Sequence, residues 1–169
     1  MTLKSLSDQF FDIAALQSEK PFLYEKKHGV WQGQTYGEVA NSVLRAAGML
    51  RMLGVNKGDR VVIGAENGIN WAVADLAIMT LGALVVPSYS TNTMDDHLHV
   101  LTDSGAVLAI TSTGALAEKM AEAAEKAKTC KTLICFEDIA LKTPTRTLMV
   151  TSWDKALEKV DISISGEVR

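Results

Sequence analysis

Apolar residues in this chain follow two alternating patterns, which predict helices separated by short buried strands. In some segments they recur every three to four residues, as on one face of a helix, and in others they form brief continuous runs. We predict helices over residues 6–16, 35–53, 67–81, 93–104 and 116–128, and strands over residues 60–63, 83–86, 107–111 and 133–136. Strands without polar alternation, separated by helices, are typical of a parallel sheet covered on both faces. We therefore expect an α/β fold with a doubly wound, mostly parallel sheet.

Turn and cap residues refine the beginning of the chain. Two aromatic-rich segments, Phe22–Tyr24 and Val30–Gln32, flank a turn that contains Gly29, and they predict a β-hairpin after the first helix. Thr35 and Glu38 have the spacing of a capping box, in which a hydroxyl and a carboxylate each bind a free backbone N–H at a helix start.

The length of 169 residues fits one domain of ordinary size. We expect one lobe over residues 1–160 and a tail or linker over 161–169, and we divide the lobe into a helix plus hairpin (1–34), an alternating core (35–136) and a weakly defined segment (137–160). In that last segment we expect a short strand at 147–150 and a helix at 153–160 that Ser152 caps.

Composition and charge exclude several classes of protein. Apolar residues make up 47% and charged residues 22%, as in globular proteins. The net charge of −3 lacks the basic footprint of nucleic-acid binding, so we expect no nucleic-acid partner. Asp8, Asp12 and Glu19 interrupt the beginning of the chain, unlike a secretory signal. No apolar run approaches the ~20 residues of a membrane span. We expect no transmembrane segment and a cytoplasmic location.

The cysteines and histidines predict no metal or redox centre. Cys130 and Cys135 are five residues apart along a predicted strand, which places them on opposite faces as two buried core thiols. His97 and His99 lie about 200° apart around a helix and cannot share a metal ion. His28 falls in the predicted hairpin turn. We therefore expect no metal-binding residue.

Two loops follow predicted strands at the end of the sheet where doubly wound proteins bind ligands. The loop Gly64–Gly68 lacks the three-glycine pattern of a dinucleotide site, so we favour Asn67 as a helix cap over a phosphate site. The loop Thr111–Gly114 lacks the lysine of a P-loop, so we favour helix capping by Ser112 or Thr113 over ligand binding.

A third loop, Pro87–Thr93, is rich in hydroxyl groups and follows a predicted buried strand. Lining of a cleft and a simple turn are equally open for it, because proline, serine and asparagine are common turn residues. The sequence also lacks the Gly-x-Ser-x-Gly elbow of hydrolases. Residue patterns alone therefore assign no catalytic, cofactor-binding or metal-binding residue.

The order of motifs resembles the N-terminal part of the adenylate-forming enzymes, the acyl-CoA synthetase group, and within it the long-chain fatty-acid–CoA ligases. Five segments carry the resemblance in family order: Thr35–Val39, Leu53–Val61, Glu66–Trp71, Gly82–Tyr89 and Leu101–Ala106. Each motif alone is a weak indication of the family, but five motifs in the family's order and spacing are a specific one. The resemblance implies the first lobe of that family's large domain.

The resemblance also implies a parent reaction. ATP and a fatty acid give an acyl-adenylate and pyrophosphate, CoA then takes the acyl group, and magnesium accompanies the ATP. The family's chemistry lies in a Thr-Ser-Gly-Thr-Thr-Gly-x-Pro-Lys-Gly phosphate loop, an adenine-binding Tyr-Gly-x-Thr-Glu, a ribose-binding Asp and a catalytic Lys of a C-terminal domain. None of these motifs occurs in this sequence, so no catalytic or cofactor-binding residue is carried over. We expect this chain alone to be inactive and to hold no cofactor of its own.

A second interpretation stays open: a freestanding flavodoxin-like module that binds or assembles and is not an enzyme. Apolar surface that is left uncovered would favour self-association, so a homo-oligomer is one expected outcome. The sequence does not set the acyl chain length of the parent enzyme or decide whether the truncation is natural.

Overall fold

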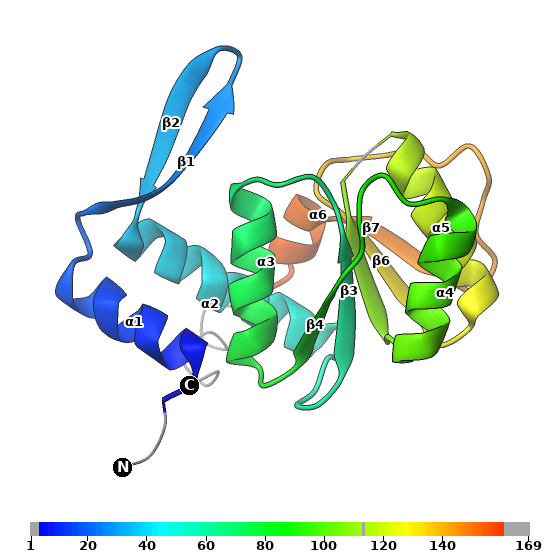
Figure 1. Ribbon diagram of the computed structural model, residues 1–169, viewed down its shortest axis with the longest axis horizontal. Coiled ribbons are helices and arrows are strands. Elements are labelled where there is room, and N and C mark those ends of the chain that lie inside the picture. Colours follow the sequence, from blue (N-terminus) through cyan, green and yellow to red (C-terminus); the bar gives the residue numbers. More distant parts are fainter. Residues whose placement is uncertain (1–3, 113, 161–169) are drawn as a thin grey trace.

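The computed structural model describes residues 4–112 and 114–160 (Figure 1). Within these residues the elements follow in this order: α1 (Leu6–Leu16), β1 (Pro21–Lys27), β2 (Val30–Thr35), α2 (Tyr36–Met52), β3 (Arg60–Gly64), α3 (Ile69–Thr80), β4 (Leu84–Pro87), α4 (Met94–Ser104), β5 (Leu108–Thr111), α5 (Ala115–Ala127), β6 (Thr132–Cys135), β7 (Met149–Ser152) and α6 (Trp153–Leu157). In this part of the chain no helix is long and apolar enough to cross a bilayer.

The central sheet has the order β4-β3-β5-β6-β7, and all its neighbouring strands are parallel. Numbered along the chain, its five strands run 2-1-3-4-5, the flavodoxin-like doubly wound order. The direction of winding reverses between β3 and β5, where Ile63 pairs with Ile110 and Gly64 with Thr111. The predicted doubly wound fold is confirmed.

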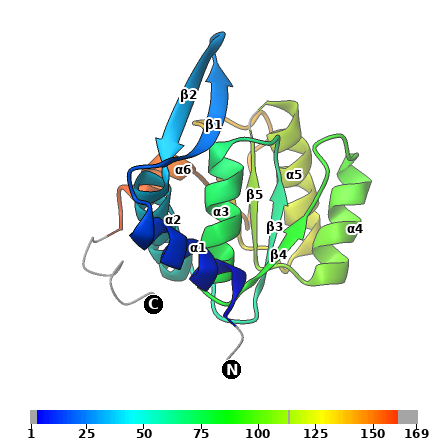
Figure 2. The ribbon, with the colours of Figure 1, turned by 60° about the vertical axis from the view of Figure 1, so that its left-hand side comes forward.

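Helices cover both faces of the sheet, as predicted (Figures 1 and 2). Successive residues of β3 point to opposite faces, because the side chains of a strand alternate. Val61 and Ile63 join the core under α1, α2, α3 and α6, whereas Val62 joins a second core under α4 and α5. The inner strands β3, β5 and β6 are almost entirely buried, which explains their lack of polar alternation.

The hairpin β1–β2 projects from the body of the molecule (Figures 1 and 2). Its strands pair antiparallel around a turn at His28 and Gly29, both of which have positive φ, so the predicted hairpin and the position of His28 are confirmed. At its base, Phe22 stacks on Tyr36 with ring centroids 4.3 Å apart. The side chains of Tyr24 and Trp31 remain exposed.

The capping box predicted at the start of α2 is confirmed. The Thr35 hydroxyl accepts from the Glu38 backbone N–H at 3.2 Å, and the Glu38 carboxylate accepts from the Thr35 N–H at 2.7 Å. Thr93 and Asp96 form the same arrangement at α4. Each box satisfies two backbone donors that a helix start leaves unpaired. Local sequence thus fixes where these two helices begin.

The segment after β6 departs from prediction. The last strand lies at Met149–Ser152, two residues later than expected, and the following helix ends at Leu157 instead of Val160. Ser152 is the N-cap residue of α6, but its side chain makes no capping hydrogen bond. The strand position is set by parallel pairing with β6, which places Cys135 opposite Ser152. The predicted tail, 161–169, lies outside the described residues.

A strap of residues 137–148 connects β6 to β7 across α5, without a described helix of its own. The Glu125 carboxylate of α5 accepts backbone N–H bonds from Arg146, Thr147 and Leu148 at 2.9–3.1 Å. The Glu118 carboxylate, two turns earlier, accepts from the Lys142 N–H at 2.8 Å. These side chains supply the hydrogen bonds that an irregular segment cannot make to itself.

The two cysteines are buried and free, as predicted. The prediction of opposite faces is wrong, because Cys130 precedes β6 and strand alternation does not apply to it. Both thiols pack in the core beneath α4 and α5. Burial raises the pKa of each thiol to about 11.

The amino ends of the strands are joined by a lock formed by Gly58, Arg60, Ser104 and Gly105. Gly58 turns the chain with φ +85° and donates its N–H to the Gly82 carbonyl at 2.9 Å. The Arg60 guanidinium donates to the carbonyls of Ser104 at 2.7 Å and Gly105 at 2.9 Å. The positive charge of Arg60 also interacts favourably with the negative, C-terminal end of the α4 dipole. The Gly-Asp-Arg and Asp-Ser-Gly motifs therefore meet in space.

Candidate functional site at the strand switch

The carboxyl ends of β3 and β5 lie side by side where the winding reverses. Ligands of doubly wound sheets bind outside such a reversal, because the loops that leave the two strands there turn in opposite directions and open a crevice. In this chain those loops are Gly64–Gly68 and Thr111–Gly114, and the structure places the Pro87–Thr93 loop beside the first. All three loops singled out in the sequence therefore lie at this edge.

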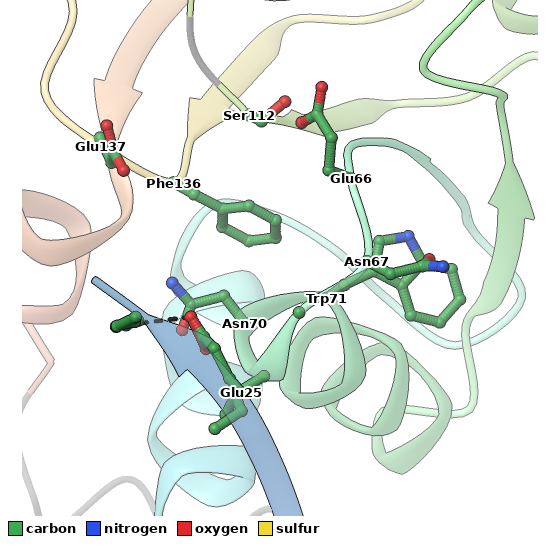
Figure 3. Close-up of a pocket in the computed structure, with 11 residues that line it drawn as sticks. Glu25, Glu66, Asn67, Asn70, Trp71, Ser112, Phe136 and Glu137 are labelled. Atoms are coloured by element: carbon green, nitrogen blue, oxygen red, sulfur yellow. Dashed lines mark ion pairs between the residues drawn. The ribbon is translucent and has the colours of Figure 1, made fainter. Parts of the chain in front are cut away.

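A hollow of about 190 Å³ opens between the two switch loops and the hairpin (Figure 3). Its wall includes Glu66, Asn67, Asn70, Trp71, Ser112, Phe136 and Glu137, with Glu25 and Lys27 of β1 at the rim. In the close-up, the Phe136 ring lies in the middle of the hollow, below the Ser112 hydroxyl and the Glu66 carboxylate.

A second hollow of about 550 Å³ adjoins the first, because Glu66, Asn67 and Trp71 line both. Its opposite wall is formed by Pro87, Ser88, Tyr89 and Ser90. We call the two hollows together the switch-point site. It is open and shallow, and the Tyr89 side chain at its edge is 81% exposed.

The Pro87–Thr93 loop thus lines a hollow, which decides between the two interpretations that its sequence left open. The loop is anchored at both ends. The Ser88 N–H donates to the Ile63 carbonyl at 2.8 Å, and Thr93 caps α4. Pro87 is the last residue of β4 and pairs with Ile63, so the strand ends at the proline, one residue later than predicted. Proline is tolerated there because β4 is an edge strand.

The two caps predicted at the switch loops are wrong. Gly68, not Asn67, is the N-cap of α3, and Gly114 is the N-cap of α5; neither helix start has a side-chain capping bond. Asn67 instead faces both hollows. Ser112 is not a cap, and its hydroxyl oxygen is buried without a hydrogen-bond partner among the described residues. Thr113 lies outside those residues.

The charge of the smaller hollow is mainly acidic. Glu66 and Glu137 are exposed on its wall, and Lys27, the one cation that lines it among the described residues, is paired with Glu25 at 3.2 Å. A phosphate group needs positioned cations and several converging N–H donors. The described residues of the smaller hollow therefore offer no unpaired cation for a nucleotide triphosphate.

Metal-binding side chains do not gather elsewhere in the described part of the chain either. No group of three histidine, cysteine, aspartate or glutamate residues is arranged there to hold an ion. His97 and His99 diverge as predicted, since His97 is fully buried and His99 is exposed.

Sequence reasoning missed one feature behind the site, the contact between Ser88 and His97. The Ser88 hydroxyl and the His97 Nδ1 are 2.8 Å apart, and both residues are buried. The helical period offered a signal, because His97 lies four residues before Leu101 on the apolar face of α4. Sequence reasoning considered the histidines only as catalytic or metal-binding residues and so missed the core position of His97.

Comparison with known proteins places this fold in a family. The chain matches the model of the AMP-binding enzyme family over residues 10–161. A long-chain-fatty-acid–CoA ligase of Mycobacterium tuberculosis, FadD15, is 43% identical over 94 residues, which are 56% of this chain and 16% of that protein. The chain therefore spans about one sixth of the length of this curated relative.

Solved structures agree with this placement. A benzoate CoA ligase from Burkholderia xenovorans LB400 superposes with a TM-score of 0.74 at 25% identity, over 94% of this chain and 29% of the other. The N-terminal domain of FACL13 from Mycobacterium tuberculosis superposes with a TM-score of 0.71 at 21% identity, over 94% of this chain and 37% of the other. The family match covers most of the chain and the fold agrees, and this chain therefore belongs to the AMP-binding enzyme family.

Proposed function

We propose that this chain is the N-terminal lobe of an ATP-dependent fatty-acid–CoA ligase. The observation that carries the proposal is the 43% identity to a long-chain-fatty-acid–CoA ligase over 94 residues. The parent reaction joins a fatty acid to ATP, releasing pyrophosphate, and then transfers the acyl group to CoA. ATP, magnesium, CoA and fatty acid are thus ligands of the parent enzyme in this proposal.

The lobe alone does not catalyse this reaction, in our proposal. Phosphoryl and adenylyl transfer depend on cations and N–H donors held in place around the phosphates. The described switch-point site presents Glu66 and Glu137, with Lys27 engaged by Glu25. Its contribution to the whole enzyme is a rigid wall made of the carboxyl ends of β3 and β5.

The test is an assay for pyrophosphate release. The purified chain is incubated with ATP, magnesium, palmitate and CoA, with the full-length Mycobacterium tuberculosis ligase as the positive control. We expect release at the level of the blank for the chain and clear release for the control. Pyrophosphate well above the blank from the chain alone would overturn the proposal of inactivity.

The strand order 2-1-3-4-5 also suits a second candidate, a freestanding flavodoxin-like binding or assembly module. The codons after Arg169 in the gene distinguish the two candidates. An open reading frame that continues into a Thr-Ser-Gly-Thr-Thr-Gly loop supports the ligase lobe. A natural stop codon at that position supports the module.

A further inference from the structure

A buried histidine lies beneath the loop that lines the larger hollow. His97 is the fourth residue of α4, and its side chain has no exposed surface. The same face of the helix carries Leu101, which is also fully buried. An ionisable side chain occupies a position where helical periodicity would place an apolar one.

The contacts around His97 suit an uncharged imidazole. The Asn92 amide donates to Ser88 Oγ at 3.2 Å, and Ser88 Oγ lies 2.8 Å from His97 Nδ1. The Ser88 oxygen keeps a second lone pair beside the bond from Asn92, so its hydroxyl meets Nδ1 as donor or as acceptor according to the tautomer of the ring. That Nε2 is buried and has no hydrogen-bond partner among the described residues.

The described elements packed around Ser88 and His97 leave little space, and none of their residues pairs with His97 through a carboxylate. A Cβ on Gly64 of β3 would lie 3.6 Å from both His97 Cε1 and Ser88 Cβ. On α5, Lys119 donates its Nζ to the Asn92 carbonyl at 3.2 Å. On α4, the exposed Asp96 carboxylate accepts from the Thr93 N–H at 2.9 Å and hydroxyl at 2.7 Å.

These surroundings oppose protonation of the imidazole. Burial first, and the positive charge of Lys119 second, lower the pKa of His97 below its usual 6.5, while Asp96 acts weakly in the opposite direction. The pKa in the closed state is therefore lower than in an open, solvated state. The contribution of uncharged His97 to the stability of the closed loop is fully present above pH 6.5. It decreases as the pH falls from 6.5 towards the lowered pKa of His97.

We propose that the Ser88–His97 contact is a proton-sensitive latch that holds the Pro87–Thr93 loop against the sheet and releases it in acid. Protonation puts a hydrogen on both ring nitrogens, so that Nε2 becomes a buried N–H donor without a partner among the described residues and the ring becomes a buried cation near Lys119. Moving the loop and His97 into water relieves that charge. Tyr89 and Ser90 move with the loop, so the wall of the larger hollow opens. The latch depends on contacts within this chain and not on the proposed ligase function.

The test follows the labelled 169-residue chain by NMR from pH 8 to pH 5. The His97 ring signals give its titration midpoint, and the amide signals of Ser88, Ser90 and Asn92 report the loop. We expect a His97 midpoint below 6.5 and the same midpoint for the loop amides. Loop signals that do not follow His97, or a His97 midpoint of 6.5 or higher, would overturn the latch.

Variants separate the latch from a general effect of acid. In Ser88→Ala, the His97 midpoint rises towards 6.5 and the loop amides at pH 8 already resemble the acid form. In His97→Leu, the loop loses its pH response. His99→Asn, an exposed neighbour on the same helix, keeps the response. A loop that still titrates in His97→Leu, or stops titrating in His99→Asn, would contradict the proposal. If His97→Leu does not fold, the wild-type titration and the other two variants decide.

Discussion

The two ends of the central sheet use their polar groups differently. At the amino ends, Arg60 pairs with the last carbonyls of α4, and Gly58 and Gly82 join neighbouring turns. At the carboxyl ends, the Ser112 hydroxyl and the His97 Nε2 are buried without a partner among the described residues. Paired groups hold the fold together, whereas buried unpaired groups cost stability.

This difference indicates that the two ends of the sheet have different roles. The amino end stabilises the lobe, and the carboxyl end keeps polar groups that only a ligand, a further chain segment or water can satisfy. In native proteins, buried polar groups without hydrogen-bond partners are often found at functional sites. Mutations at the two ends should therefore have unequal effects on stability, and four predictions test that comparison, the largest expected effect first.

The largest loss is expected for Arg60→Ala. The change removes two charge-assisted hydrogen bonds to the carbonyls of Ser104 and Gly105 and a cation at the α4 C-terminus. We expect the free energy of unfolding, measured by urea denaturation, to decrease by about 2–3 kcal/mol. Arg60→Lys should recover part of this, because an ammonium cannot reproduce the planar fork. Arg45→Ala, on the exposed face of α2, serves as the control. A loss below about 0.5 kcal/mol for Arg60→Ala would remove the basis of the comparison.

A smaller loss is expected for Gly105→Ala, in the same lock. Gly105 has φ +61°, and a Cβ there would lie 2.8 Å from the Arg60 Nη2 atom. Left-handed backbone costs an alanine about 1–2 kcal/mol, and displacement of Arg60 adds to it. The matched control is Gly54→Ala, where φ is +91° and the added Cβ meets nothing within 4 Å. Equal losses for the two variants, measured by urea denaturation, would mean that the Arg60 contact contributes nothing.

The sequence predicted the core of this fold because local and long-range signals agree there. Thr35 and Glu38 cap α2 as expected, and the unbroken apolar run at Val61–Ile63 is a fully buried strand. The sequence motifs also indicated the family. The meeting of Arg60 with Gly105 could not be predicted, because the two lie 45 residues apart and come together only through the sheet.

The candidate site was predicted in position but not in detail. Its three loops were identified from strand ends alone, since parallel strands share a carboxyl edge. The caps were wrong because core packing sets where α3 begins: Ile69 is buried, so the helix starts there and Gly68 becomes the cap residue. Asn67 is left outside the helix, on the wall of both hollows.

A third prediction concerns the strap, which runs from the carboxyl end of β6 back to the amino end of β7. Desolvation raises the pKa of Glu125, but hydrogen bonds from Thr147, Arg146 and Leu148 outweigh it and leave that pKa below 4.5. The strap is therefore held fully above pH 4.5 and loosens as the pH falls through the lowered value. Glu125→Gln should loosen it at neutral pH, seen as faster tryptic cleavage between α5 and β7.

Glu122→Gln is the matched control for the strap, because the Glu122 carboxylate pairs with Lys126 on the outer surface of the same helix. We expect its cleavage rate to equal that of the wild type. Faster cleavage in both variants would mean that the lost negative charge on α5 causes the effect. The hydrogen bonds between Glu125 and the strap would then not be its cause.

The smallest effect, and the one that separates the two ends most directly, is expected for Ser112→Ala. Its buried hydroxyl makes no hydrogen bond among the described residues, so removal should leave the free energy of unfolding unchanged or raise it by up to about 1 kcal/mol. The adjacent Thr111→Val is the contrast, since the Thr111 hydroxyl donates to the Gly64 carbonyl at 2.8 Å and its loss should cost about 1–2 kcal/mol. Urea denaturation of both variants measures the difference. A clear loss for Ser112→Ala would show that this hydroxyl already has a structural partner, and it would no longer count among the unpaired groups of the carboxyl end.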